Sequence, residues 1–417
     1  MVKRVALDNN VHILTEHISN VRSVSVGFFI DTGSRYESPE INGVSHFIEH
    51  MMFKGTRRRT AKDIAEELDA VGGQLNAYTT KEYTCYFARV LDEYFDLAVD
   101  LLSDMLFESN FDACDIDRER NVIIEEIKMY EDAPDELVHD IFAGSMWGGH
   151  ALGQPIIGTA EVITGLSRDT LYNYYQTNYT PGKMVVAVAG NVAHENIINK
   201  LRPIFEKRKG NGQSNARTIP SPRLDNVCRY KETEQVHLCV GTPGLMLDHE
   251  NIYVFQIINT ILGGGLSSRL FQEIREQRGL VYSVYSYHSS YRDTGLFCIY
   301  AGLSKKNIDE VLDLIFKQIK DIRLNSVKKE ELQRAKDQLK GNLYLSLENV
   351  NTRMSRLGKS QLYLGKVISP EDVVSRVNKV TTEEIQGLAL EMLDPSRFSL
   401  ATIGPWEDCG SLVKALK

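Results

Sequence analysis

Two histidines and a glutamate stand close together near the start of the chain, in the run His46-Phe47-Ile48-Glu49-His50. On an α-helix, side chains at positions i and i+4 project from one face, so His46 and His50 can present two imidazole nitrogens to a single ion. Imidazole suits zinc, which in catalytic sites keeps one position open for water. Glu49 lies beside the pair, where its carboxylate can act on that water. The run therefore predicts one Zn²⁺ per chain, with an ordinary surface helix as the alternative.

A third ligand is expected from a second helix downstream. Residues 115–131 have apolar side chains at helical spacing, and Glu119 and Glu126 fall on that same face. A carboxylate on such a face is costly to bury without a nearby cation. We expect Glu126 to complete the metal site and Glu119 to contact a ligand or the water. Helix facing favours Glu126 and leaves its neighbour Glu125, expected to be solvated, as the alternative.

The helices that carry these residues belong to an α+β plan that occurs twice. In the first half, the predicted elements are a strand at 24–30, the motif helix, a helix at 61–71 with Thr60 as its cap, strands at 75–80 and 83–90, and an amphipathic helix around residues 97–105. In the second half, they are a strand at 236–240, helices at 252–262 and 267–277, a hairpin at 282–303 and a helix at 307–319.

A shift of 209 residues, the difference between positions 255 and 46, aligns the two halves. At this register the motif residues stand opposite residues that do not bind zinc, namely Phe255, Ile258 and Asn259. We therefore expect a duplicated domain in which only the first copy kept metal ligands. Two unrelated α+β domains with the same element order are the alternative.

The chain of 417 residues is 42% hydrophobic, which is enough to bury two cores. Residues 211–224 are polar and contain glycine and proline, as is typical of a linker. We expect a zinc-binding peptidase domain at 1–210 and a homologous domain at 225–417 that supplies substrate-binding residues. Each is expected to be an α/β sandwich, with helices packed on an antiparallel-rich sheet.

Composition excludes several other classes of function. A net charge of −8 argues against a nucleic-acid surface. No stretch is long and apolar enough to span a bilayer, and no signal peptide is seen, so we expect a cytoplasmic bacterial protein away from the membrane. Six scattered cysteines without CxxC spacing predict buried thiols, with neither a disulfide framework nor a cysteine-rich zinc site.

These motifs resemble the pitrilysin and insulinase superfamily of inverzincin metallopeptidases. The chain is most similar to the single-length members, the β subunit of mitochondrial processing peptidase and its bacterial relatives. The likeness includes the runs 53–56, 76–78 and 263–270. In that family the glutamate that completes the site follows the motif after roughly 75 residues. Here 75 residues separate His50 from Glu126, which supports Glu126 independently of helix facing.

The resemblance also implies substrate-binding residues. Arg275 and Tyr282 match the family's R-x6-Y pair, which binds the substrate backbone and steadies the oxyanion; taken alone, they would be a solvated arginine and a packed aromatic. The processing-peptidase branch implies that Glu136 and Asp140 recognise a substrate arginine near the cut, and that Phe53 lines the pocket after it. Taken alone, the acidic pair is one helical turn apart, where a guanidinium can bridge it, although such pairs are more often only solvated.

Together these features predict a zinc-dependent endopeptidase that hydrolyses extended or unfolded peptides. Zinc, Arg275 and Tyr282 are expected to stabilise the oxyanion, with Glu49 as the general base. The substrate is expected to add a strand at the edge that carries residues 76–78, namely Asn76, Ala77 and Tyr78. Because family members of this length pair two subunits around a chamber, we expect a homodimer.

Two other classes of protein are alternatives to an endopeptidase. A non-catalytic structural subunit, like the respiratory-complex core proteins of this fold, would have lost its ligands, and the motif with Glu126 argues against it. A peptide-binding subunit would need the arginine and tyrosine of another chain. The presence of Arg275 and Tyr282 in this chain argues against that class.

Overall fold

A computed structural model describes residues 2–208, 210 and 217–405. The chain divides into two compact units. The first contains Met1–Lys128, Gln154–Arg217 and Ser346–Ile368, and the second contains Met129–Gly153, Thr218–Leu345 and Ser369–Lys417. Each half of the sequence therefore gives a segment to the unit formed mainly by the other half. Part of the expected linker, residues 211–216, lies outside the described residues, and residues 217–226 have no regular secondary structure.

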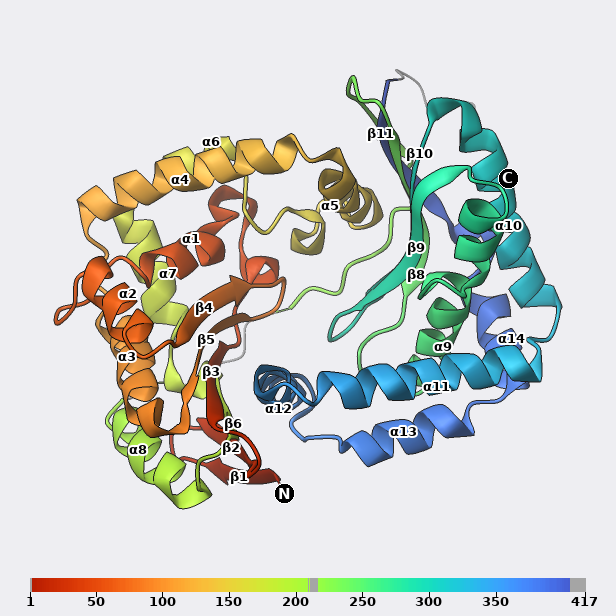
Figure 1. The fold of residues 1–417 in the computed structure, drawn as a ribbon. Coiled ribbons are helices and arrows are strands. Elements are labelled where there is room, and N and C mark those ends of the chain that lie inside the picture. The colour runs from red at the N-terminus through yellow and green to blue at the C-terminus, as the bar shows by residue number, and fades with distance from the viewer. Residues whose placement is uncertain (1, 209, 211–216, 406–417) are drawn as a thin grey trace. The chain divides into compact units, whose positions relative to one another are not determined.

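The first unit is built on a six-stranded sheet with the order β1-β2-β6-β3-β5-β4 (Figure 1). Its strands are β1 (Val2–Ala6), β2 (His12–His17), β3 (Ser23–Ile30), β4 (Gln74–Thr79), β5 (Thr84–Leu91) and β6 (Met184–Gly190). β2 and β6 are parallel, and every other neighbouring pair is antiparallel. β4 forms one edge of the sheet. β3 is buried on both faces, whereas the alternation of its apolar residues predicts one buried face.

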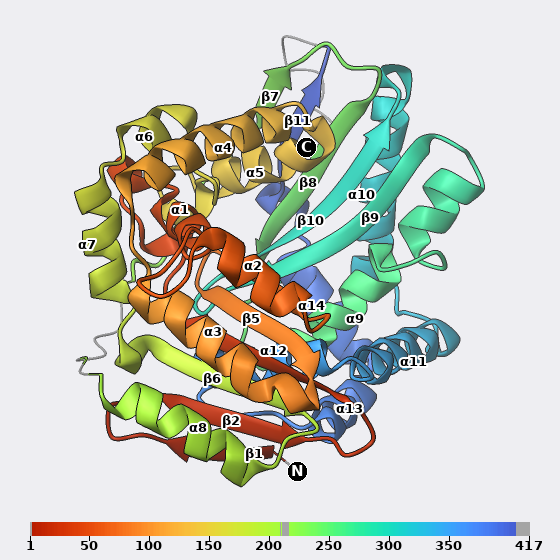
Figure 2. The same ribbon diagram turned by 60° about the vertical axis from the view of Figure 1, so that its left-hand side comes forward.

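Helices cover both faces of this sheet. The helices of the unit are α1 (Val44–Met51), α2 (Ala61–Asp69), α3 (Phe95–Glu108), α6 (Ala160–Gly165), α7 (Arg168–Asn178), α8 (His194–Glu206) and α12 (Val350–Leu364), together with most of α4 (Ala113–Glu131). The helices that contact its strands include α1, α2, α3, α8 and α12. Figure 2 shows α3 and α8 in front of the strands that they contact, and α12 packs on β2, β3 and β6 from behind. The expected cap of α2 is confirmed, because Thr60 and Asp63 form a reciprocal capping box.

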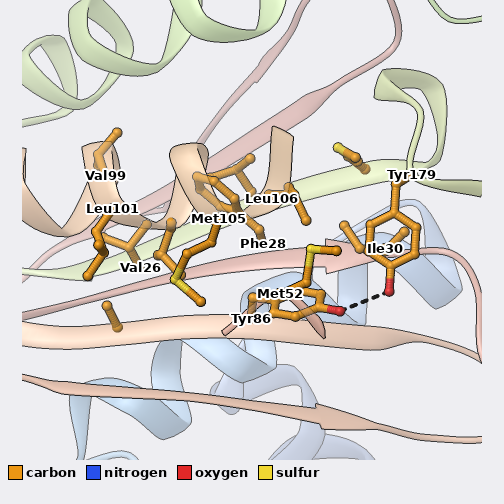
Figure 3. Packing of buried hydrophobic residues seen from close by; sticks show 14 of the residues in the cluster. Val26, Phe28, Ile30, Met52, Tyr86, Val99, Leu101, Met105, Leu106 and Tyr179 are labelled. Carbon is orange, nitrogen blue, oxygen red and sulfur yellow. Dashed lines mark hydrogen bonds between the residues drawn. The ribbon is translucent and has the colours of Figure 1, made fainter. Parts of the chain in front are cut away.

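The main core of the first unit lies between α3 and the central strands (Figure 3). Phe28 from β3 and Met105 from α3 are almost fully buried there. The hydroxyls of Tyr86 and Tyr179 also lie in this core and are 2.9 Å apart, within hydrogen-bonding distance. Their mutual hydrogen bond offsets much of the cost of burying two polar groups.

The second unit repeats this plan with five strands in the order β7-β11-β8-β10-β9. They are β7 (Val227–Tyr230), β8 (Val236–Gly244), β9 (Val281–Ser290), β10 (Gly295–Leu303) and β11 (Ser399–Gly404). β7 is parallel to β11, and the remaining pairs are antiparallel, which matches β2, β6, β3, β5 and β4 in order and direction. The expected duplicated α+β fold is therefore confirmed.

The helices of the second unit are α5 (Pro134–Met146), α9 (Ile252–Gly263), α10 (Ile308–Leu324), α11 (Lys329–Ser346), α13 (Pro370–Lys379) and α14 (Thr382–Met392). α5 packs on β8 and β11, and α9 and α14 cover the strands from the other side. The helix expected at 267–277 is only partly present, as a π-helix at Phe271–Glu276. The preceding glycines at 263–265 do not favour a longer helix.

Apolar packing explains why residues 129–153 belong to the second unit and residues 346–368 to the first. Phe142 and Met146 of α5 pack against the strands of the second unit, whereas Met354 and Leu357 of α12 pack against Phe29 and its neighbours in the first. Each sheet therefore buries its second face under a helix from the other half of the sequence.

The cysteines only partly follow the expectation of buried thiols. Three are free and buried, namely Cys85, Cys239 and Cys298. The expectation is wrong for Cys114, which is free but exposed, and for Cys228, which is disulfide-bonded. Cys409 lies outside the described residues. Over the described part of the chain, no helix combines the length and the apolar character needed to cross a membrane.

Candidate metal centre

The motif helix α1 has one buried face and one partly exposed face. Its apolar side chains pack into the core of the first unit, and they are Val44, Phe47, Ile48 and Met51. The three residues with ligand or acid–base chemistry lie on the other face and are half-buried, namely His46, Glu49 and His50. Burial of the apolar face therefore fixes the direction in which this second face points.

A buried carboxylate from outside the helix holds the N-terminus of α1. Glu37 accepts hydrogen bonds from the backbone of Gly43 at 2.7 Å and of Ser45 at 2.8 Å. Asn42 donates to the same carboxylate at 3.1 Å. Burial raises the pKa of Glu37, although these donors favour the charged form. Gly43 has a φ of 96°, and a Cβ there would lie 2.7 Å from the Ile157 carbonyl, so this position requires glycine.

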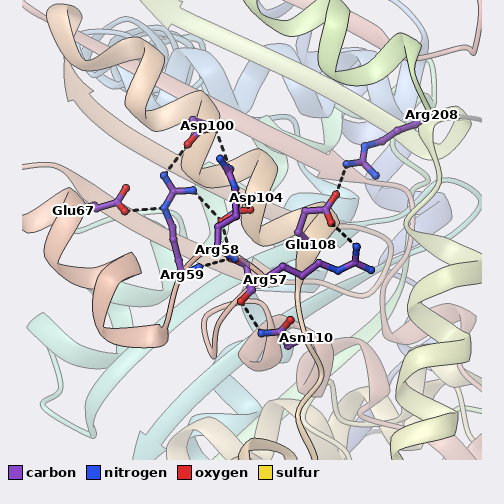
Figure 4. Close-up of polar contacts among 10 residues, drawn as sticks. Arg57, Arg58, Arg59, Glu67, Asp100, Asp104, Glu108, Asn110 and Arg208 are labelled. Carbon is purple, nitrogen blue, oxygen red and sulfur yellow. Dashed lines mark hydrogen bonds and ion pairs between the residues drawn. The ribbon is translucent and has the colours of Figure 1, made fainter.

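An ionic network anchors the segment that follows α1 (Figure 4). The buried carboxylate of Asp104 on α3 accepts hydrogen bonds from Thr56 at 2.7 Å and from Arg58 and Arg59 at 2.9 Å. Arg59 also pairs with Asp100 at 2.7 Å. Both ends of the motif helix are thus tied to surrounding structure by buried carboxylates.

Helix α4 brings a carboxylate to the histidine pair. Oε2 of Glu126 lies 3.9 Å from Nε2 of His46 and 3.7 Å from Nε2 of His50. Ligand atoms of these three residues all lie within 4.8 Å of one another. The side chain of Glu125 is 71% exposed and pairs with Lys128 at 2.7 Å. Helix facing therefore directs Glu126, and not Glu125, toward the histidines.

These donors fit a zinc ion. Tetrahedral zinc with bonds of roughly 2.0–2.1 Å separates neighbouring donors by about 3.3 Å, so the observed distances need only a small contraction. The centroids of the His46 and His50 rings are 4.7 Å apart. Burial, followed by the influence of His50, lowers the pKa of His46 to about 3. The imidazole of His46 is therefore neutral at pH 7, which is the form that binds a metal.

Glu119 supports the histidine pair from behind. Its carboxylate lies 3.0 Å from Nδ1 of His50 and 2.7 Å from Nζ of Lys54. Such a contact orients the imidazole and leaves Nε2 for a metal. The buried position of Glu119 is explained by this pair of partners, because a buried carboxylate needs compensating charge or hydrogen bonds.

Glu49 is hydrogen-bonded to the edge strand β4. The hydroxyl of Thr79 donates to Oε2 of Glu49 at 2.5 Å. Burial raises the pKa of Glu49, and the hydrogen bond from Thr79 partly offsets this rise. A carboxylate whose pKa is raised toward neutrality is suited to transferring protons.

The other candidates in the first unit lie on β4 or just after α1. Asn76 is exposed, and its side chain accepts a hydrogen bond from the Ala77 amide at 2.8 Å. Tyr78 packs edge-on against Tyr83, with ring centroids 5.8 Å apart. Phe53 is half-buried against the core. The outer side of β4 has no strand neighbour among the described residues.

Four candidates belong to the second unit. Tyr282 is 75% exposed on the edge strand β9. Arg275 is exposed, with its guanidinium 4.8 Å from the Phe271 ring, and forms no ion pair with any described residue. Glu136 is exposed and Asp140 half-buried, one turn apart on α5.

Three residues of this centre were not expected from the sequence, namely Glu37, Lys54 and Thr79. Lys54 stands four residues after His50 but lies beyond the end of α1 at Met51, so helical spacing does not indicate its contact with Glu119. Glu37 and Thr79 reach the motif helix through the fold of the chain, so no local pattern indicates them.

Comparisons with known proteins agree with this geometry. Residues 12–160 match the family model described as Insulinase (Peptidase family M16), and residues 165–339 match the one described as Peptidase M16 inactive domain. An uncharacterized zinc protease of Bacillus subtilis, YmxG, is 45% identical over 405 residues, covering 97% of this chain and 98% of the relative.

Solved structures share the fold. A peptidase M16 inactive domain from Pseudomonas fluorescens superposes with a TM-score of 0.91 at 20% identity, covering 97% of this chain and 98% of that one. A chain of Complex III2 from Candida albicans gives a TM-score of 0.87 at 19% identity, covering 99% and 98%. At such identities the likeness concerns the fold alone.

Proposed function

This chain belongs to the M16 family, within the pitrilysin and insulinase superfamily of metallopeptidases, and from this premise we propose that it is an endopeptidase with one zinc ion held by His46, His50 and Glu126. The observation that carries the proposal is the convergence of the three ligand atoms within 4.8 Å, beside Glu49. A non-catalytic subunit would not need this set of donors. The complete set therefore favours an enzyme over a structural relative of the same fold.

The chemistry follows from the donors and their neighbours. When bound, zinc supplies a Lewis acid for the peptide carbonyl and lowers the pKa of water toward neutrality. Glu49 accepts the proton of the attacking water and delivers it to the leaving amine. Thr79 holds the Glu49 carboxylate in place for both transfers.

Substrate binding is proposed at the edge of β4. A peptide that adds a strand there forms backbone hydrogen bonds, which do not depend on its sequence. Because Thr79 of this strand contacts Glu49, a paired peptide would pass close to the base. Only an extended or unfolded segment can bind in this way.

We assign Arg275 and Tyr282 to the substrate backbone and the oxyanion. Both are exposed, so their polar ends are available to a ligand. Replacement of Tyr282 by phenylalanine should lower kcat about tenfold or more without loss of zinc. An unchanged kcat would remove Tyr282 from the mechanism.

The finer specificity is proposed to be a preference for arginine near the cut, read by Glu136 and Asp140. Loss of a charge-assisted hydrogen bond costs about 1.5–3 kcal/mol, or roughly 10- to 100-fold. Glu136→Gln and Asp140→Asn should therefore weaken cleavage of arginine peptides, whereas Asp135→Asn, at an exposed neighbouring position, should not. Equal losses on neutral peptides would contradict this preference.

The family resemblance also leads us to propose a homodimer, which sedimentation of the purified chain would test. The central experiment on function compares wild type with Glu49→Gln in a peptide-cleavage assay, with zinc measured in parallel. The variant should keep its zinc and lose about 10²- to 10⁴-fold in kcat. Unchanged cleavage would contradict the mechanism.

A further inference from the structure

Three ligand-type side chains meet beneath α5, within the second unit. His139 lies on α5, Cys239 on β8 and Cys298 on β10. Their ligand atoms all lie within 4.8 Å of one another, and both thiols are fully buried. Because the cysteines come from different strands, the absence of a CxxC spacing concealed this cluster in the sequence.

The register of the sheet explains how the two thiols come together. Cys239 stands opposite Tyr300, and Cys298 stands opposite Gly241, so the cysteines are diagonal neighbours on one face. Diagonal neighbours are roughly 7–8 Å apart, beyond the Cα separation of roughly 4.4–6.8 Å usual for a disulfide. Both thiols are free. The backbone therefore leaves two thiols directed toward α5.

Distances within the cluster match donors that share an ion. Sγ of Cys239 lies 3.5 Å from Nδ1 of His139. The side chain of Cys298 is in hydrogen-bonding contact with Cys239 and His139. Zinc with a Zn–S bond of about 2.3 Å and a Zn–N bond of about 2.0 Å places tetrahedral sulfur and nitrogen donors about 3.5 Å apart.

The hydroxyls of two tyrosines contact the imidazole of His139. The hydroxyl of Tyr285 lies 3.2 Å from Nε2 of His139, so Nδ1 is the ring nitrogen on the side of the thiols. The hydroxyl of Tyr287 lies 2.8 Å from Nδ1, within hydrogen-bonding distance, so an ion that binds Nδ1 takes the place of this contact. Tyr287 stands opposite Cys298. An oxygen donor is therefore available beside the two sulfurs and the nitrogen.

We propose that His139, Cys239 and Cys298 form a second metal site, for a soft divalent cation of the zinc class. Two thiolates and an imidazole select such ions over magnesium or calcium. An ion held there pins α5 to β8 and β10. The site is independent of the His46 centre, whose donors include no sulfur.

The test uses the full chain under anaerobic conditions and without a reductant, so that the disulfide of Cys228 stays intact. Every sample carries Cys114→Ser because Cys114 is an exposed thiol. Cd²⁺ is titrated, and thiolate-to-metal charge-transfer absorption is recorded. The His46 centre cannot contribute to this absorption because it has no thiolate. The parent should saturate at one thiolate-bound ion per chain, and so should Cys85→Ser, which removes a buried cysteine outside the cluster.

Cys239→Ser and Cys298→Ser should each weaken Cd²⁺ binding at least 100-fold, and His139→Asn about tenfold or more. Absorption that is absent from the parent, or equally strong in Cys298→Ser, would overturn the proposal. If circular dichroism shows that the serine variants do not fold, His139→Asn decides the question, since both thiols remain. Unchanged affinity in that folded variant would also overturn it.

Discussion

Glu119 holds His50 through a contact of 3.0 Å between its Oε2 and the Nδ1 of the imidazole. The other carboxylate oxygen lies 2.7 Å from Lys54, so one buried group joins a proposed metal ligand to a cation. This arrangement fixes which nitrogen of His50 faces Glu126.

Glu119→Gln is expected to weaken zinc binding about 10- to 100-fold, because the contact that orients His50 loses its charge. Cleavage at saturating zinc should fall as well. Zinc affinity measured by competition with a chromophoric chelator checks the first effect. Affinity equal to that of wild type would show that Glu119 does not support the ligand.

Glu37→Ala is expected to lower the free energy of unfolding by about 2–4 kcal/mol, because the backbone N–H groups of Gly43 and Ser45 lose their acceptor. Urea unfolding of the zinc-free protein measures this change. Glu40→Ala, at an exposed position nearby, serves as the matched control and should change stability by less than about 0.5 kcal/mol. Similar losses of unfolding free energy in Glu37→Ala and Glu40→Ala would argue against Glu37 as the residue that anchors α1.

Asp104→Asn is expected to lower the free energy of unfolding by about 1.5–3 kcal/mol, because Thr56, Arg58 and Arg59 lose a charged acceptor. Arg59 keeps its ion pairs with Glu67 and Asp100. Burial acts to raise the pKa of Asp104, but hydrogen bonds from Thr56, Arg59 and Arg58 outweigh it, and the net pKa lies below the usual value.

The stabilising effect of Asp104 is therefore complete above the unfolded-state pKa of about 3.9 and is lost as the pH falls through the lower folded-state pKa. The difference in unfolding free energy between wild type and Asp104→Asn should shrink on acidification below about pH 4. Asp96→Asn, at an exposed site on the same helix, is the control. A difference that stays constant from pH 7 to about pH 2 would contradict this role.

Much of the fold can be predicted locally. Alternation predicts β3, and helical periodicity with a Thr60 cap predicts α2, because these signals lie within a few neighbouring residues. The exchange of α5 and α12 between the units could not be predicted, since it depends on which sheet face receives Phe142 and Met354. The periodicity of a single helix does not indicate which sheet that helix packs on.

In the candidate centre, too, some features have a local sequence signal and others depend on the tertiary fold. Helical spacing predicts that His46 and His50 share a face and that Glu126 lies on the apolar side of its helix. The contacts of Glu37 and Thr79 with α1 form only when the chain folds, so they had no local signal. The cluster of Cys239 and Cys298 depends on strand register in the same way.

The most direct test of the central claim is the zinc content of Glu126→Gln measured beside Glu125→Gln, by elemental analysis of the purified proteins. The two positions are adjacent, and the substitution is identical, but only Glu126 approaches the histidines. We expect about one zinc per chain in Glu125→Gln and in wild type, and a large loss of zinc in Glu126→Gln. Full zinc in Glu126→Gln, or equal loss in both variants, would contradict the claim.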